Sequence, residues 1–342
     1  MIVHSKTKIT IRDTLAVIRV LFSGQVNDSH ISSVLAEQFS LLTHASHARV
    51  TCSGTMGLVR ALYSLGTDPG THVFTTSYVC EDIAEAILIL GAIPVFVDID
   101  ASSFNLCPAD YERKVSILRS QGKHLGPVVV PHMFGCPADI RRIVTVGLPV
   151  IEDLTHSLGD RQGDKLGYFG DACFSSLQAL KVITAGEGGV VSYRHRPSRE
   201  LAFSGDHLSN LNSALAISQL SRLTQIRQKR EQISRLYEAE IYEKLGGEFR
   251  LQQSSFGPFT RFRVVGLLEK DQSVEGVMTK LLSVGVVTRR PVKKLLQSNG
   301  YASDDLPVAR KVFAMALSLP AHLHMSATKI RYVVKRLQEA LE

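Results

Sequence analysis

Several features that would assign this chain to a secreted, membrane or repeat class are missing from its sequence. No apolar run approaches the ~20 residues that span a bilayer, and residues 1–13 contain no apolar core of a signal peptide. There is no internal repeat and no low-complexity tract. We therefore expect a globular protein of the cytoplasm without a membrane partner.

Cysteine is scarce and its spacing is uninformative. The five cysteines, at positions 52, 80, 107, 136 and 173, form no CxxC pair and no metal-ligand spacing. Three of them lie in or beside apolar runs, which is typical of reduced core cysteines. We expect neither a disulfide framework nor a metal site.

Charge is positive overall but is not concentrated. The net charge of +7 favours anionic partners through long-range attraction. The densest basic runs, RQKR at 227–230 and TRRPVKK at 288–294, are short and are typical of solvated faces. No nucleic-acid motif accompanies them, so no nucleic-acid partner is predicted.

Strands alternate with helices through the first two thirds of the chain. Apolar segments at 72–77, 93–100, 126–135, 148–154 and 170–177 predict strands, separated by segments with helical periodicity. This pattern predicts an α/β fold with a mostly parallel central sheet. Catalytic groups in such sheets gather at the carboxyl ends of strands, where the candidates are Asp98, His132, Asp153 and Ser176.

The pattern changes near the C-terminus. Residues 212–247 form a largely helical connection, and beyond them a strand, a helix, a short strand and a last helix from about Ser326 predict a smaller α+β domain. We expect a large domain over residues 1–230 and a small domain over residues 231–342.

Lys181 is the most informative single residue. It stands between the apolar pairs Ala179-Leu180 and Val182-Ile183, and a Gly-rich turn follows at residues 186–189. A lysine in apolar surroundings has a lowered pKa and can offer a neutral amine to a carbonyl, forming a Schiff base. The alternative is a lysine whose stem covers apolar surface while its head reaches water.

Three further features are ambiguous by themselves. Ser53-Gly54-Thr55 at the start of a predicted helix could cradle a phosphate or could simply cap the helix. Asp153, after a strand, could pair with a protonated ring nitrogen or could be a solvated loop acid. Ser176 could add a hydrogen bond to the phosphate. Their order, with a phosphate turn, then an acid, then a lysine 28 residues later (181 − 153), is the layout expected for pyridoxal phosphate.

With these residues in view, the sequence resembles the DegT–StrS sugar aminotransferases. The resemblance rests on SGTMGLVRAL, GAIPVFVDID, VVVPHMFGCPADI, VIEDLTHSLG and FSSLQALKVITAGEGG, which occur in this order. It is close over roughly residues 12–220 and looser beyond. It implies a fold-type I pyridoxal-phosphate enzyme, with a large domain like that of aspartate aminotransferase.

The resemblance also implies roles for individual residues. Lys181 would form the Schiff base and shuttle protons, and Asp153 would hold the pyridinium nitrogen. His156 would sit against the cofactor ring, and the phosphate would be bound by Gly54, Thr55 and Ser176. The family has a stacking aromatic residue where this chain has Cys80, and Tyr78 is the nearby aromatic candidate for the cofactor site.

The family's activity implies the rest of the expectation. An amino donor, usually glutamate in this family, would charge the cofactor, and a keto sugar on a nucleotide carrier would accept the amino group. Family sites are built across a dimer interface, so we expect a homodimer.

Two departures from the family pattern leave alternatives open. The segment between Gly189 and Leu211 is short, and it offers only Gly205 or Asn210 for the asparagine that reaches a neighbouring subunit's phosphate. The arginine expected nearby is His207. One alternative is a degenerate relative that serves as a partner or regulatory subunit. Another is a cofactor enzyme of different reaction type, such as a dehydratase, although that branch replaces the lysine with histidine.

Overall fold

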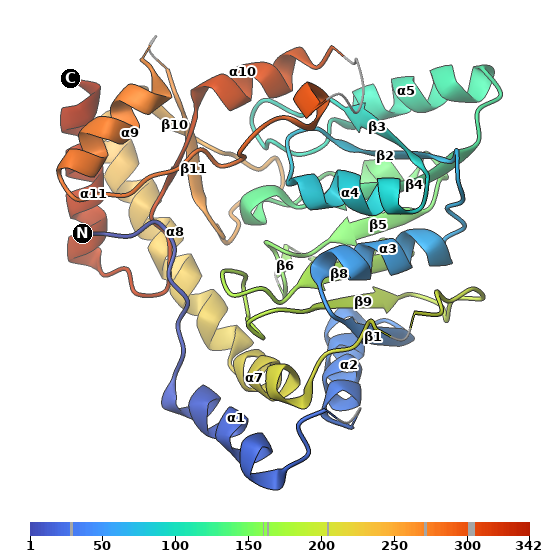
Figure 1. The fold of residues 1–342 in the computed structure, drawn as a ribbon. Coiled ribbons are helices and arrows are strands. Elements are labelled where there is room, and N and C mark those ends of the chain that lie inside the picture. Colours follow the sequence, from blue (N-terminus) through green and yellow to red (C-terminus); the bar gives the residue numbers. More distant parts are fainter. Residues whose placement is uncertain (28–29, 160, 163, 204, 270–271, 300–304) are drawn as a thin grey trace.

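The core of the protein is a sheet of seven strands. The computed structural model describes residues 1–342 except 28–29, 160, 163, 204, 270–271 and 300–304. The strand order is β1-β9-β8-β5-β4-β2-β3, and only the pairings of β9 with β1 and β8 are antiparallel (Figure 1). The strands are β1 (His47–Thr51), β2 (His72–Thr76), β3 (Ile93–Val97), β4 (Leu125–Pro131), β5 (Val150–Asp153), β8 (Ala172–Ser176) and β9 (Gly189–Tyr193). The prediction of a mostly parallel central sheet is confirmed.

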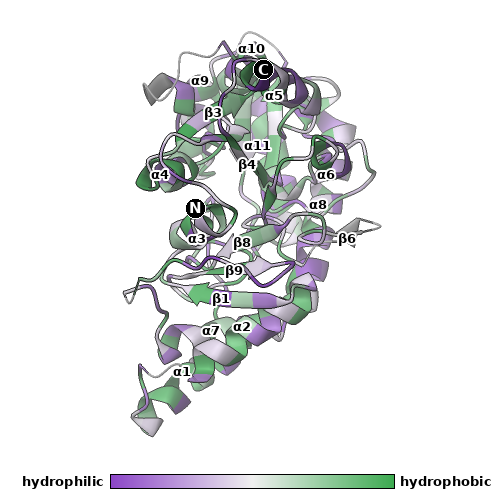
Figure 2. Cartoon of the chain, turned by 90° about the vertical axis from the view of Figure 1, so that its right-hand side faces the viewer, coloured by the Kyte–Doolittle hydropathy of each residue, from purple (hydrophilic) through white to green (hydrophobic). Residues whose placement is uncertain are grey.

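Helices cover both faces of this sheet because side chains alternate along its buried strands. Val129 and Ile151 point into the core under α3 (Gly54–Ser64) and α4 (Glu81–Ile89), whereas Val128 and Val130 point into the core under α5 (Pro108–Ser120) and α6 (Ile140–Val144). Figure 2 shows the result, with α3 and α4 on one side of β4 and β8 and with α6 on the other.

The edge of the sheet near β1 is covered by a third group of helices. These are α2 (His30–Thr43) and α7 (Asn210–Leu220), with α1 (Ile11–Ser23) packed on α7. The buried Asp13 of α1 fixes this contact. Its carboxylate accepts hydrogen bonds from the Ser218 hydroxyl at 2.7 Å and from the Arg222 guanidinium at 2.6 Å.

The C-terminal part builds a second, antiparallel sheet in the order β10-β11-β12. One face of this sheet packs on three helices, and the other face joins the core of the large sheet through Val265, Leu267 and Ala316. The elements are β10 (Phe249–Leu251), β11 (Val264–Leu268), β12 (Ala316–Leu319), α8 (Leu223–Leu245), α9 (Val274–Ser283) and α11 (Ala327–Leu341). The last helix begins where the sequence predicts, and Ser326 caps it by accepting from the Lys329 amide.

The part that contains the large sheet and the C-terminal part are joined by helices and by contacts of the N-terminal residues. The predicted helical connection is two helices, α7 and α8, and α8 runs through the predicted boundary at residue 230. The N-terminus also crosses over, because the Ile2 amide donates to the Gly285 carbonyl at 2.7 Å and the His4 Nε2 lies 2.9 Å from the Ser318 hydroxyl. The division at residue 230 therefore stays a prediction.

Asp98, one of the candidates at a strand end, has a structural role. Its carboxylate accepts hydrogen bonds from the amides of Val308 at 3.0 Å and Ala309 at 2.8 Å. These amides begin α10 (Pro307–Met315), so Asp98 caps a C-terminal helix from the end of β3.

The remaining elements are short. They are the 3₁₀ turns Met133–Gly135 and Leu296–Asn299 and the paired strands β6 (Arg161–Gln162) and β7 (Asp164–Lys165). None of the described helices is both long and apolar enough to cross a membrane.

Candidate active site

The turn Ser53-Gly54-Thr55 opens α3 directly beside the ends of β8 and β9. Ser53 is the N-cap, and its hydroxyl accepts from the Met56 amide at 3.1 Å. The amides of Gly54 and Thr55 lie in the first turn, where a helix has no acceptors of its own and favours an anion. All three residues line a cavity.

Two close backbone contacts explain the glycines at this turn. A Cβ on Gly54 would lie 2.7 Å from the Cβ of Ser176, and a Cβ on Gly189 would lie 2.3 Å from the Ser53 carbonyl oxygen. Neither distance is sterically possible without a shift. Glycine is therefore required for the turn to reach the ends of β8 and β9, which also brings Ser176 into the lining of the same cavity.

Asp153, the last residue of β5, lines the same cavity. The side chain is buried, and its carboxylate accepts a 2.8 Å hydrogen bond from the Thr155 amide. Burial raises the pKa of this carboxyl group above its ordinary value. None of the described cationic side chains forms an ion pair with Asp153. Its buried carboxyl group is therefore able to pair with a protonated group of a ligand.

Lys181, in the loop after β8, lines the same cavity as Asp153. Burial lowers the pKa of its amine below the ordinary value, and the charge of Arg263 acts in the same direction, while the Asp153 carboxylate opposes both. A larger fraction of neutral amine is therefore present than on an exposed lysine. The four predicted residues Gly54, Thr55, Asp153 and Ser176 and the predicted lysine all line one cavity.

Glu152, the neighbour of Asp153, points the other way and is structural. The Ala138 amide donates to Nδ1 of His132, so the His132 Nε2 carries the proton and donates to Glu152 at 3.1 Å. Glu152 also accepts from the amides of Gly167, Phe169 and Gly170. Burial alone would raise the pKa of this carboxyl group, but these donors lower it. His132, a candidate at a strand end, thus supports a loop.

Two of the predicted cofactor contacts are not among the described residues that line the cavity. Tyr78 is fully buried, with its ring edge-on to Phe104 and Phe134 at centroid distances of 6.3 and 6.2 Å. The Tyr78 ring packs within the aromatic core, so its position does not support a contact with the cofactor. Cys80 lines the cavity instead.

His156 is stacked on protein side chains. Its ring lies 4.5 Å from the Phe262 ring at an interplanar angle of 17°, and 5.9 Å from the Phe134 ring. Burial lowers its pKa well below the ordinary value, helped by the charges of Lys181, Arg263 and Arg230. His156 is therefore neutral near pH 7, and its contact with a cofactor ring stays a prediction.

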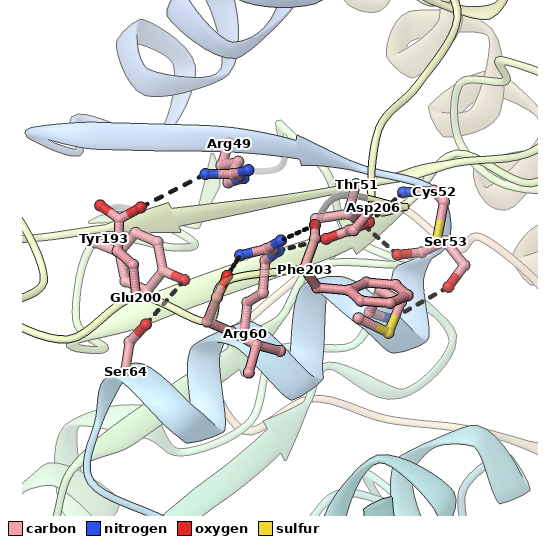
Figure 3. Close-up of polar contacts among 12 residues, drawn as sticks. Arg49, Thr51, Cys52, Ser53, Arg60, Ser64, Tyr193, Glu200, Phe203 and Asp206 are labelled. Carbon is pink, nitrogen blue, oxygen red and sulfur yellow. Dashed lines mark hydrogen bonds and ion pairs between the residues drawn. The ribbon is translucent and has the colours of Figure 1, made fainter.

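The short segment after β9 is held against α3 by a buried ion pair that no sequence motif indicated. Arg60 of α3 pairs with Asp206, and its guanidinium also donates to the Leu201 carbonyl at 2.7 Å (Figure 3). Asp206 in turn accepts from the Cys52 amide at 2.7 Å, which ties the segment to the turn before α3. Both side chains are buried.

The candidates for a cross-subunit contact are placed differently. Asn210 is buried, and its side-chain amide donates to the Gln25 carbonyl at 2.8 Å, so it already serves an internal contact. Gly205 and His207 are exposed.

The fold and the cavity together are those of a fold-type I pyridoxal-phosphate aminotransferase. The chain belongs to the DegT/DnrJ/EryC1/StrS aminotransferase family, whose model matches residues 8–203 and 198–338. It is therefore an aminotransferase, and its cofactor is pyridoxal phosphate.

Solved structures with the same fold cover nearly the whole chain. PseC from Helicobacter pylori is 20% identical with a TM-score of 0.89, covering 99% of both chains. TlmJ from Streptoalloteichus hindustanus is 21% identical with a TM-score of 0.89, covering 100% of this chain and 99% of that one. Spr1654 from Streptococcus pneumoniae in its PLP form is 19% identical with a TM-score of 0.88, covering 99% and 98%.

The residues present fit this cofactor. The wall of the cavity includes the N-terminus of α3 with the close-packed Gly54. It also includes the buried carboxylate of Asp153, which has no ion-pair partner among the described residues. A phosphate suits the first feature and a protonated ring nitrogen suits the second.

Gly189→Ala tests whether the close approach of the turn builds this cavity. The added Cβ must displace the Ser53 backbone, so we expect the free energy of unfolding to fall by about 1–3 kcal/mol and the affinity for pyridoxal phosphate to fall as well. Urea titration and cofactor titration measure the two effects. Gly247→Ala, where nothing lies within 4 Å, is the control. Equal behaviour of the two variants would contradict the packing argument.

Proposed function

We propose that this enzyme transfers an amino group from glutamate to a keto sugar, carried on a nucleotide, in the cytoplasm. The observation that carries the proposal is the single cavity that Lys181 and Asp153 share with the turn at Gly54. The similar proteins support the acceptor class, because PseC is described as an aminotransferase of pseudoaminic acid biosynthesis. Five free cysteines are compatible with the cytoplasm.

Each residue has a distinct proposed role. The amides of Gly54 and Thr55 and the Ser176 hydroxyl hold the phosphate, and Asp153 holds a proton on the ring nitrogen. When bound, pyridoxal phosphate supplies an aldehyde that condenses with an amine and a ring that accepts electrons. The partly buried Lys181 amine would hold the cofactor through that aldehyde in the resting enzyme. Once freed, Nζ would accept the proton from the substrate carbon that bears the amino group and would later donate it, acting first as general base and then as general acid.

Lys181→Ala tests the assignment of the lysine. Wild-type protein loaded with pyridoxal phosphate should absorb near the visible edge, and borohydride should fix the cofactor covalently to the Lys181 peptide, as read by mass spectrometry. The variant should lose both signals, whereas exposed Lys311→Ala should keep them. Wild-type protein that stays colourless with added cofactor would refute the enzyme assignment for these residues.

The donor and the acceptor are tested by the two half-reactions. Glutamate should bleach the absorbance of the loaded protein, and a keto-sugar nucleotide should restore it. Asp153→Asn keeps the shape of the side chain but removes its charge, so we expect bleaching at least about 10²-fold slower. If only another amine bleaches the band, the donor is not glutamate. If only a free keto sugar restores it, the acceptor is not nucleotide-linked.

We also propose that the enzyme is a homodimer, with α1 in the interface. α1 lies at the lower end of the molecule in Figure 2, and the apolar side chains of Ile11 and Phe22 are 80% and 89% exposed. Exposed apolar side chains on one helix are typical of a surface that associates.

Phe22→Asp tests this interface. Burying a carboxylate there without a partner is costly, so we expect the dimer to dissociate at concentrations where the wild type is paired. Sedimentation velocity over a concentration series measures the difference. Tyr242→Asp, at an 86% exposed site on α8, should leave association unchanged. A wild type that is monomeric throughout, or a loss of pairing in Tyr242→Asp alone, would show that the interface is wrongly assigned.

A further inference from the structure

Lys181 also lines a second cavity. Its walls come from the N-terminal residues 4–8, from the loop around Lys181, and from the C-terminal part at Phe262, Arg263 and Leu319–Leu323. Among the described residues, Lys181 is the one that lines both this cavity and the cofactor cavity. A molecule bound here lies directly beside the reactive amine.

The two cavities differ in charge. The cofactor cavity contains the carboxyl groups of Asp82, Asp153 and Glu187. None of the described residues that line the second cavity is Asp or Glu, while five are Lys or Arg: Lys6, Lys8, Lys181, Arg230 and Arg263. The Lys6 and Lys8 side chains are exposed, so their charges stand at the rim.

Arg263 carries the strongest argument. It is half-buried just before β11, and its guanidinium donates to the Pro291 carbonyl at 2.9 Å. The guanidinium carbon lies 6.0 Å from the centre of the Phe134 ring and 5.9 Å from that of Phe262. No carboxylate among the described residues forms an ion pair with it.

The charged and titratable neighbours of Arg263 make this arrangement costly. Arg289 is a cation, and Lys181 adds a second positive charge when it is protonated. Burial raises the pKa of Cys80 and of Tyr78, so neither supplies a negative charge near pH 7. His4 is buried and neutral, with a pKa lowered to about 3 by burial and by the charges of Arg263 and Arg289. A guanidinium has five N–H donors, and the Pro291 carbonyl accepts a hydrogen bond from only some of them. One carbonyl and two aromatic rings compensate a partly desolvated cation poorly, whereas an oxyanion compensates it well.

We propose that Arg263, with Lys6 and Lys8 at the rim, forms an anion-binding subsite that receives a carboxylate or phosphate group of the substrate while its reacting end lies at Lys181. The inference rests on the proposed function, because it treats Lys181 as the reactive amine. The planar guanidinium suits two oxygens of one oxyanion, and the exposed lysines attract the anion over a longer range.

The test measures binding of two unreactive anions to the enzyme loaded with pyridoxal phosphate, so that its phosphate turn is filled. Glutarate represents the dicarboxylate donor, and inorganic pyrophosphate represents the phosphates of a nucleotide-linked acceptor. Isothermal titration calorimetry on the wild type should show binding of at least one probe, weakening as salt is added. Binding of glutarate assigns the subsite to the donor, and binding of pyrophosphate assigns it to the acceptor.

Arg263→Gln should weaken that binding at least tenfold while leaving the cofactor absorbance intact. Arg263→Lys, which keeps the charge but loses the fork of donors, should weaken it less. Arg250→Gln, at a partly exposed arginine on β10, should match the wild type. The variant Lys6→Glu/Lys8→Glu changes only exposed side chains, so it tests the same cavity if Arg263→Gln does not fold, and we expect it to weaken binding several-fold.

The proposal is overturned if the loaded wild type binds neither probe, or if Arg263→Gln and Lys6→Glu/Lys8→Glu both bind like the wild type. Either result leaves the absorbance and the borohydride product at Lys181 untouched, so it refutes the subsite alone. Loss of those two signals in the wild type refutes the proposed function instead.

Discussion

The site depends on one steric constraint, the close approach of the turn before α3 to the ends of β8 and β9. A backbone can come this near only if Gly54 and Gly189 lack side chains, since each added Cβ would overlap Ser176 or Ser53. That contact sets the distance between the first turn of α3 and the strand ends that carry Asp153 and Ser176. The Arg60–Asp206 pair then holds the segment after β9 against the same turn.

The C-terminal part contributes to the site because it is locked to the sheet. Asp98 caps α10 from the end of β3, and the N-terminal residues pair with the C-terminal part before they pass Lys181. These contacts hold Phe262 and Arg263 beside the loop that carries the lysine. A cavity between parts that lie far apart in the chain thus has a defined shape.

Site residues that lie in short sequence motifs could be predicted, whereas residues placed by contacts between distant segments could not. Gly54, Asp153, Ser176 and Lys181 lie in short motifs next to strand or helix ends, so their common location follows from the parallel sheet. Alternation along β5 separates Glu152 from Asp153, which a period of two predicts. The positions of Tyr78 and Arg263 could not be predicted in this way. Tyr78 packs against Phe104 and Phe134, which are distant in the sequence. Arg263 lines a cavity whose other residues come from both ends of the chain. No local pattern contains those contacts.

The contrast between the two cavities bears on how Lys181 changes its protonation. Burial and the charge of Arg263 both favour the neutral amine of Lys181, which is the form that attacks a carbonyl. An anion bound at Arg263 would offset that repulsion and raise the pKa of the amine. The lysine would then accept a proton more readily when substrate is present than when it is absent. The charge of the substrate and the transfer of the proton would then be coupled through the guanidinium of Arg263.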